Sequence, residues 1–100
     1  MFKLKKEQNG SELLITMVGI LDTPATPKLA EALDGVYDGL TKLTFEFRDL
    51  EYLTSAGLRV LLEAQQEMDD REAEMILLNV SDDIMEVFRL TGFDDVLTFG

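Results

Sequence analysis

Residues 47–62 read FRDLEYLTSAGLRVLL and contain the change from one type of secondary structure to another. Just before and within the start of this segment, Leu43, Phe45 and Phe47 alternate with polar residues, which predicts a strand. Further on, mainly apolar side chains recur at intervals of three and four residues, which predicts the inner face of a helix over residues 55–70. The residues of that face are Leu58, Leu61, Leu62, Gln65 and Met68.

Two hydroxyl residues, Thr54 and Ser55, lie where this helix begins. Either can accept a hydrogen bond from a free amide of the first turn, so the simplest interpretation is a helix cap. Gly57 costs about 1 kcal/mol relative to alanine, a cost tolerated where a neighbouring element or a partner protein comes close. A helix start also tolerates an anion, and a phosphoserine there would add about −1.5 to −2 charges, which a tightly packed partner would not accept. Capping and a phosphorylation switch both remain open on these residues alone.

The beginning of the chain predicts a hairpin. Residues 2–7 fit a short edge strand, Asn9-Gly10 is a turn signal, and the apolar segment 13–21 fits a second strand. Gly19, near the end of that second strand, predicts a bulge or a close backbone approach.

A helix is predicted after this hairpin. Thr23 or Thr26 can cap it, and each precedes a proline suited to the first helical position. Gly39 is the expected end. The apolar residues with helical spacing are Leu29, Ala32, Leu33, Val36, Tyr37 and Leu40.

The last third of the chain predicts a strand and a helix. MILLNV, residues 75–80, is a short apolar run typical of a central parallel strand. Ser81 predicts a helix cap and Gly92 a helix end, and VLTF, residues 96–99, fits a short final strand or a cover for the core. The order ββαβαβα predicts one α/β domain over residues 1–100, with a mixed sheet of four to five strands covered by helices.

Composition excludes several classes of function. The chain has no cysteine and no histidine, so it lacks thiolate and imidazole metal ligands and the commonest general base. Its net charge of −11 disfavours nucleic acid and favours a partner with a basic surface, unless it only keeps the surface solvated. There is no membrane-length apolar run and no signal peptide. We expect a cytoplasmic monomer that binds neither nucleic acid nor membrane and needs no metal or cofactor.

Two segments carry a resemblance to a known family. VGILDTPATPKL, residues 18–29, resembles the Gly-x-Leu-Asp entry into the first helix of STAS domains of the anti-sigma factor antagonist class. FRDLEYLTSAGLRVLL resembles the segment that holds their acceptor serine. The resemblance covers nearly the whole chain. It implies a transcription regulator that, when unphosphorylated, binds an anti-sigma factor that is also a serine kinase, and so frees a sigma factor. Phosphorylation by that kinase separates the pair, and a serine phosphatase resets the antagonist.

The resemblance places the acceptor on Ser55, directly before a small residue and Gly57. Many antagonists have aspartate before the acceptor, whereas this chain has Thr54, a candidate second acceptor or a cap. Asp22 matches the family's carboxylate near the docking surface, and a turn or cap role also fits it. The partner-binding residues predicted in this way are Asp22, Thr23, Thr26, Thr54, Ser55, Ala56, Gly57 and Arg59.

Two other functions stay open. A constitutive STAS scaffold in a larger signalling complex, never phosphorylated, fits the presence of Thr54. An enzyme would need a lysine or a carboxylate to activate Ser55, and the chain has no glycine-rich phosphate loop. The residues therefore favour a binding module over an enzyme.

Overall fold

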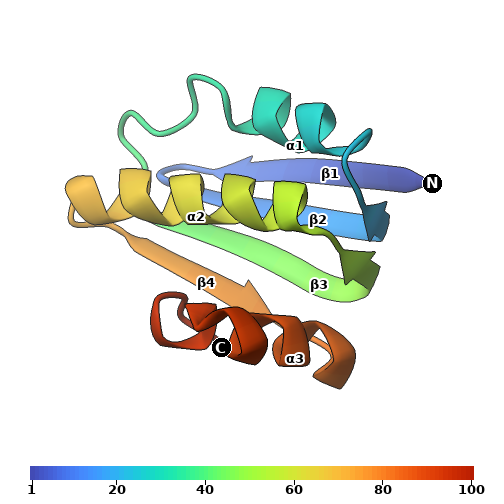
Figure 1. Cartoon of the computed structure of the whole chain (residues 1–100). Coiled ribbons are helices and arrows are strands. Elements are labelled where there is room, and N and C mark those ends of the chain that lie inside the picture. Colours follow the sequence, from blue (N-terminus) through green and yellow to red (C-terminus); the bar gives the residue numbers. More distant parts are fainter.

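Four strands form one mixed sheet in the computed structural model, which describes residues 1–100 (Figure 1). The strands lie in the order β1-β2-β3-β4, with β1 antiparallel to β2 and the pairs β2–β3 and β3–β4 parallel. The predicted fold class and order of elements are confirmed. The elements are β1 (Phe2–Asn9), β2 (Glu12–Leu21), α1 (Thr26–Leu33), β3 (Lys42–Leu53), α2 (Ser55–Asp70), β4 (Glu74–Leu78), α3 (Asp82–Thr91) and a 3-10 turn η1 (Phe93–Asp95).

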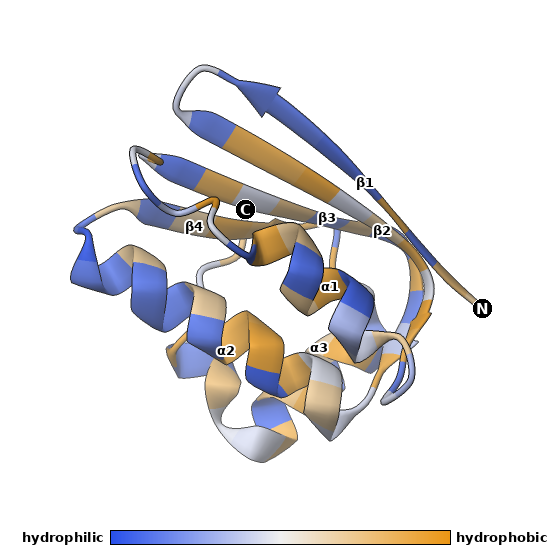
Figure 2. Cartoon of the chain, turned by 90° about the horizontal axis from the view of Figure 1, so that it is seen from above, coloured by the Kyte–Doolittle hydropathy of each residue, from blue (hydrophilic) through white to orange (hydrophobic).

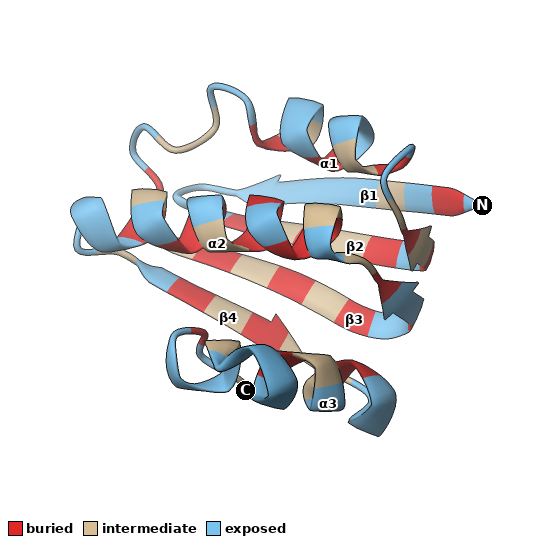
Figure 3. Ribbon diagram, in the orientation of Figure 1, coloured by how far each residue is buried: buried red, intermediate tan, exposed pale blue.

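All three α-helices lie on the same face of the sheet (Figure 2). In β2, β3 and β4 the residues facing them are buried and alternate with half-buried or exposed residues, whereas β1 is exposed along most of its length (Figure 3). The core holds 24 buried apolar residues, and Phe45, Phe47 and Phe88 are among its fully buried side chains. The helical layer is therefore one broad surface of the molecule, and the other face of the sheet carries no helix.

The first two strands form the predicted hairpin. Asn9 pairs with Glu12, so the turn is made by the two residues between them, one position later than Asn9-Gly10. Gly10 has a φ of 64°, a left-handed conformation that glycine adopts without strain. Near the other end of β2 the pairing with β3 shifts register after Gly19, where a Cβ would overlap the carbonyl oxygen of Met1. The bulge and the close backbone approach are both confirmed.

Helix α1 begins without a threonine cap. Its N-cap position is Ala25, and no side chain caps the helix from that position. Asp22 Oδ1 accepts a hydrogen bond from the Ala25 amide at 3.0 Å, and Thr26 Oγ1 donates to the Asp22 carbonyl oxygen at 2.9 Å. The prediction that Thr23 or Thr26 caps this helix is therefore wrong, because the local turn is held by Asp22. Pro27 does lie in the first turn.

Helix α1 also ends at Leu33 and does not continue to Gly39 as predicted. The next residue is extended, and Gly35 follows with a φ of 72°, which breaks the helix. Although the chain beyond is irregular, Leu40 is buried and Tyr37 packs against the core. These residues are apolar because the loop buries them, and their spacing resembles that of a helix. The sequence therefore predicted a helix that was too long.

Strand β4 lies at the edge of the sheet, which corrects the prediction of a central strand. Part of its outer edge is occupied by the end of the chain: the Leu77 amide donates to the Thr98 carbonyl at 2.9 Å, and the Gly100 amide donates to the Leu77 carbonyl at 3.0 Å. The predicted final strand is thus a single parallel bridge between Leu77 and Phe99. This cover explains why an edge strand has so apolar a sequence.

Helix α3 begins and ends as predicted. Ser81 Oγ accepts a hydrogen bond from the Ile84 amide at 3.3 Å, and Gly92 ends the helix with a φ of 80°. Phe88 of this helix meets Phe47 of β3 edge to face, with ring centroids 6.3 Å apart. This contact fixes α3 against the sheet beside α2.

Candidate partner-binding surface

Ser55 is the first residue of α2, and it is exposed at the N-terminal end of the helix. Thr54 holds the N-cap position, yet its side chain accepts no hydrogen bond from the first turn. Its Oγ1 donates instead to the Leu21 carbonyl oxygen at 3.4 Å. The prediction that Thr54 or Ser55 caps the helix is therefore wrong. No hydroxyl neutralises the first amides of α2, so its positive end stays open to an anion beside Ser55.

Gly57 is buried because α2 approaches the end of β2 at this point. A Cβ on Gly57 would lie 2.6 Å from Leu21 Cγ and 3.0 Å from the Leu21 carbonyl oxygen. The Thr54 amide donates to the same carbonyl at 3.0 Å, so Leu21 anchors the start of α2. A neighbouring element therefore accounts for the glycine, and contact of Gly57 with a partner stays a prediction.

Four of the predicted binding residues surround one hollow of about 370 Å³ between α1 and the first two turns of α2. Its lining consists of Thr26, Ser55, Ala56, Arg59, Val60 and Glu63. The sequence did not indicate Val60, and it indicated Glu63 only as a candidate rim contact on the solvated face of the helix. Asp22 is half-buried and Thr23 is exposed, and both lie in the turn before α1, outside this lining.

A second hollow, of about 320 Å³, lies on the other side of Ser55, between α2 and the end of α3. It is lined by Ser55, Leu58, Arg59, Leu62, Thr91 and Phe93. Ser55 and Arg59 line both hollows and therefore form a ridge between them. Sequence reasoning missed Leu62 as a surface residue, because its spacing placed it on the inner face, where it is only half-buried.

The ridge carries a free positive charge. Arg59 is exposed, and its guanidinium takes part in none of the four salt bridges of the chain. Because Arg59 lies one helical turn after Ser55, its side chain is on the same face of α2. The ridge thus joins a small hydroxyl and an unpaired cation at the open end of a helix.

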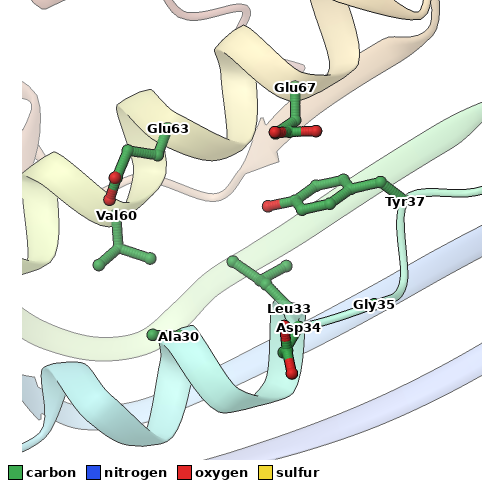
Figure 4. Close-up of a pocket in the computed structure, with 8 residues that line it drawn as sticks. All are labelled: Ala30, Leu33, Asp34, Gly35, Tyr37, Val60, Glu63 and Glu67. Atoms are coloured by element: carbon green, nitrogen blue, oxygen red, sulfur yellow. The ribbon is translucent and has the colours of Figure 1, made fainter.

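A third hollow, the α1–α2 groove of about 330 Å³, continues from the first one along the two helices. Its lining is Ala30, Leu33, Asp34, Gly35, Tyr37, Val60, Glu63 and Glu67 (Figure 4). Val60 and Glu63 line this groove and the first hollow alike, so the two are continuous. Figure 4 shows the Tyr37 ring projecting between the helices, with Glu67 beside it.

Arg71 holds Tyr37 and the wall of this groove in place. Its guanidinium forms salt bridges with Glu67 and with Asp38, and lies 5.5 Å from the centre of the Tyr37 ring. Partial burial raises the pKa of Tyr37 to about 12, with the charges of Glu67 and Glu63 adding to the rise and that of Arg71 opposing it. The phenol is therefore neutral throughout the physiological range.

No group of three or more acidic side chains is arranged to hold a metal ion. None of the helices combines the length and the apolar character needed to cross a bilayer.

The chain belongs to the STAS domain family, because the sequence model of that family matches residues 3–100. An anti-sigma-B factor antagonist of Listeria monocytogenes is 30% identical over 94 residues, which cover 92% of this chain and 82% of the relative.

Two solved structures share the fold. The unphosphorylated form of the anti-sigma factor antagonist SpoIIAA is similar with a TM-score of 0.78 at 20% identity, covering 100% of this chain and 87% of that one. The phosphorylated form of SpoIIAA, a Bacillus cell fate determinant, gives a TM-score of 0.77 at 22% identity, covering 100% and 91%. The recognised resemblance and the fold are thereby confirmed.

Proposed function

We propose that this chain is an anti-sigma factor antagonist whose binding is controlled by phosphorylation of Ser55. The observation that carries the proposal is the position of Ser55: exposed, at the open positive end of α2, on the ridge between two hollows. A protein kinase can reach such a side chain, and a docked partner would cover it. The catalytic chemistry belongs to the partner, and the antagonist acts by binding.

A phosphate at Ser55 would act on binding and leave the fold intact. The phosphoserine would add about −1.5 to −2 charges next to the first amides of α2 and the unpaired Arg59, where an anion is tolerated. A partner packed over the ridge would have to desolvate those charges, which costs far more than desolvating a hydroxyl. Phosphorylation therefore separates the two proteins without unfolding either.

The relatives support both parts of this proposal. The Listeria relative carries the name of an anti-sigma-B factor antagonist. SpoIIAA is known in unphosphorylated and phosphorylated forms, and this chain is similar to both with nearly equal TM-scores. A phosphate on that fold thus requires no different arrangement of the elements.

The proposed partners follow from this cycle. The unphosphorylated monomer binds a cytoplasmic anti-sigma factor that is also a serine kinase, and so releases a sigma factor. The kinase phosphorylates Ser55 and dissociates, and a serine phosphatase restores the hydroxyl. The binding surface comprises the ridge, the turn at Asp22 and Thr23, and the start of α1 at Thr26.

The test compares variants of Ser55 for binding to the purified cognate anti-sigma kinase. We expect Ser55→Ala to bind as the wild type does, and Ser55→Asp to bind at least roughly tenfold more weakly, a difference of about 1.4 kcal/mol. Both variants should unfold within about 0.5 kcal/mol of the wild type, since the side chain is exposed. Equal binding of all three proteins would contradict a switch at Ser55.

A constitutive scaffold is the second candidate, and Thr54 in place of the usual aspartate favours it. Intact-mass measurement after incubation with the kinase and ATP separates the two functions. The switch predicts one added phosphate in the wild type and in Thr54→Ala, and none in Ser55→Ala. The scaffold predicts no added phosphate in any of these proteins.

A further inference from the structure

We propose that the α1–α2 groove receives a basic side chain, arginine or lysine, from the protein that docks over Ser55. This inference rests on the proposed function, since it concerns the same partner. It adds a second point of recognition, separate from the phosphorylated ridge. Three features of the groove carry it: an apolar floor, carboxylates without partners, and continuity with the hollow beside Ser55.

The floor of the groove suits the aliphatic part of a long side chain. Leu33 and Ala30 from α1 face Val60 from α2, and the ring of Tyr37 closes one end (Figure 4). Arginine and lysine bury their methylene groups along such surfaces while the charged head reaches polar groups. At about 330 Å³, the groove is larger than one side chain needs, so the occupant can enter without moving either helix.

The walls of the groove supply the opposite charge. Asp34, Glu63 and Glu67 line it, and no basic residue does. Glu67 is paired with Arg71, but Asp34 and Glu63 take part in none of the salt bridges of the chain. Two exposed carboxylates without a counter-charge thus lie at the edge of the groove, Glu63 beside Val60 and Asp34 at the end of α1 (Figure 4). A cation arriving from a partner would meet an unpaired carboxylate at either place, and the neutral phenol of Tyr37 could accept a hydrogen bond from it.

Continuity with the Ser55 hollow indicates that one partner covers both places. Val60 and Glu63 are shared by the two linings, and α2 runs directly from Ser55 to Glu67. The end of the surface at Ser55 carries the unpaired Arg59, whereas the groove beyond it is lined by the unpaired Glu63 and Asp34. This polarity fits a partner whose own surface is acidic or neutral near Ser55 and basic one to three helical turns away.

A peptide probe tests the groove without the partner. The probe is a short, otherwise neutral peptide with a single arginine, and its matched control carries citrulline, which has the same shape without the charge. Chemical shifts of the backbone amides are followed by NMR at low salt. We expect the arginine peptide to shift amides around Asp34, Tyr37, Val60 and Glu63, and the citrulline peptide to shift them much less.

Two double variants make this test specific. Asp34→Asn with Glu63→Gln removes the two unpaired carboxylates, and Asp94→Asn with Asp95→Asn removes the same charge from η1, outside the groove. The first pair of substitutions should weaken binding of the arginine peptide. Each lost contact should lower the affinity by at most roughly fivefold, because an exposed ion pair contributes no more than that. The second pair should leave binding unchanged. Equal losses in both, or shifts spread over the whole acidic surface, would overturn the inference in favour of non-specific attraction.

The same variants separate this inference from the proposed function. If the groove variant binds the kinase normally while Ser55→Asp does not, the groove inference is wrong and the switch stands. If the groove variant binds weakly but Ser55→Asp binds like the wild type, the groove contact stands and the switch is wrong.

Discussion

Gly57 has no side chain, so the start of α2, which carries Ser55, can pack directly against Leu21. An alanine Cβ here would lie 2.6 Å from Leu21 Cγ, and Leu21 is fully buried and cannot move aside freely. We expect Gly57→Ala to destabilise the chain by about 1–3 kcal/mol, the usual cost of overpacking, although alanine favours a helix by about 1 kcal/mol. Urea unfolding measures the change. Ala56→Gly, at the half-buried neighbouring position, is the control and should cost about 1 kcal/mol through helix propensity alone. A Gly57→Ala protein more stable than the wild type would contradict the close approach.

Because its pKa is raised, Tyr37 should make the free energy of unfolding depend on pH in the alkaline range. Its pKa is about 12 in the folded chain and about 10 in the unfolded one, so the folded state holds the proton more tightly. This contribution is fully present below about pH 10 and is lost as the pH rises toward 12. Unfolding free energies over this range should fall less steeply for Tyr37→Phe than for the control Tyr52→Phe. Parallel pH profiles for the two variants would show that Tyr37 ionises as in the unfolded chain.

Individual site residues differed in how well the sequence predicted them. Ser55 was predicted as an exposed helix start, because the apolar spacing after it defines where α2 begins. The predicted caps were wrong for a physical reason: the Thr54 hydroxyl donates to the Leu21 carbonyl, and Asp22 holds the turn before α1 without capping that helix. The sequence identifies side chains that could accept hydrogen bonds from the first turn of a helix. In α2, the packing of the helix start against the end of β2 decides that Thr54 does not do so.

At the scale of the elements, the caps of α2 and α3 should contribute unequally. Ser81 Oγ accepts a hydrogen bond from the first turn of α3, whereas Thr54 makes no such bond for α2. We therefore expect Ser81→Ala to lower the unfolding free energy by about 1 kcal/mol, and Thr54→Ala to lower it by only a few tenths. Thermal unfolding of the two variants compares them directly. A larger loss in Thr54→Ala would mean that its bond to Leu21 matters more than the 3.4 Å distance indicates.

The turn before α1 separates a structural role of Asp22 from a binding role. Asp22→Ala removes the side-chain acceptor of the Ala25 amide, which keeps its second bond to the Asp22 carbonyl at 3.1 Å, and should cost about 0.5–1 kcal/mol, whereas Asp22→Asn keeps a side-chain acceptor and should cost little. Unfolding and kinase binding are measured on both. If Asp22→Asn is as stable as the wild type but binds the kinase weakly, its charge contacts the partner. If it binds normally, Asp22 acts only in the turn.

Elements were predicted well where burial and periodicity agree. Helix α2 begins and ends where its pattern predicted, because its inner face packs on the sheet along its whole length. Helix α1 was predicted too long, since Tyr37 and Leu40 are buried from a loop, and β4 was predicted central, since the end of the chain covers its edge. Burial alone does not distinguish a helix from a packed loop, or a central strand from a covered edge. The α1–α2 groove could not be predicted either, because its walls come from two elements whose relative placement only the fold defines.

The charge of the whole molecule should govern how fast it meets its partner. With a net charge of −11, association with a basic surface is accelerated at low ionic strength. Between about 0.01 M and 0.15 M salt the screening length falls from about 30 Å to about 8 Å, so we expect the association rate constant to fall by roughly tenfold. The dissociation rate constant should change less. Stopped-flow mixing with the kinase measures both, and an association rate independent of salt would exclude a basic partner surface.

The helices cover only one side of the sheet, so a label on the other side can be used to follow binding. Thr16 lies between the buried Ile15 and Met17 on β2, so its side chain projects away from the helices. The chain has no cysteine, so Thr16→Cys would introduce a unique thiol for a fluorescent dye. A dye attached there lies on the helix-free face of the sheet. Its fluorescence anisotropy can report tumbling and complex size without covering the proposed binding surface on the helices.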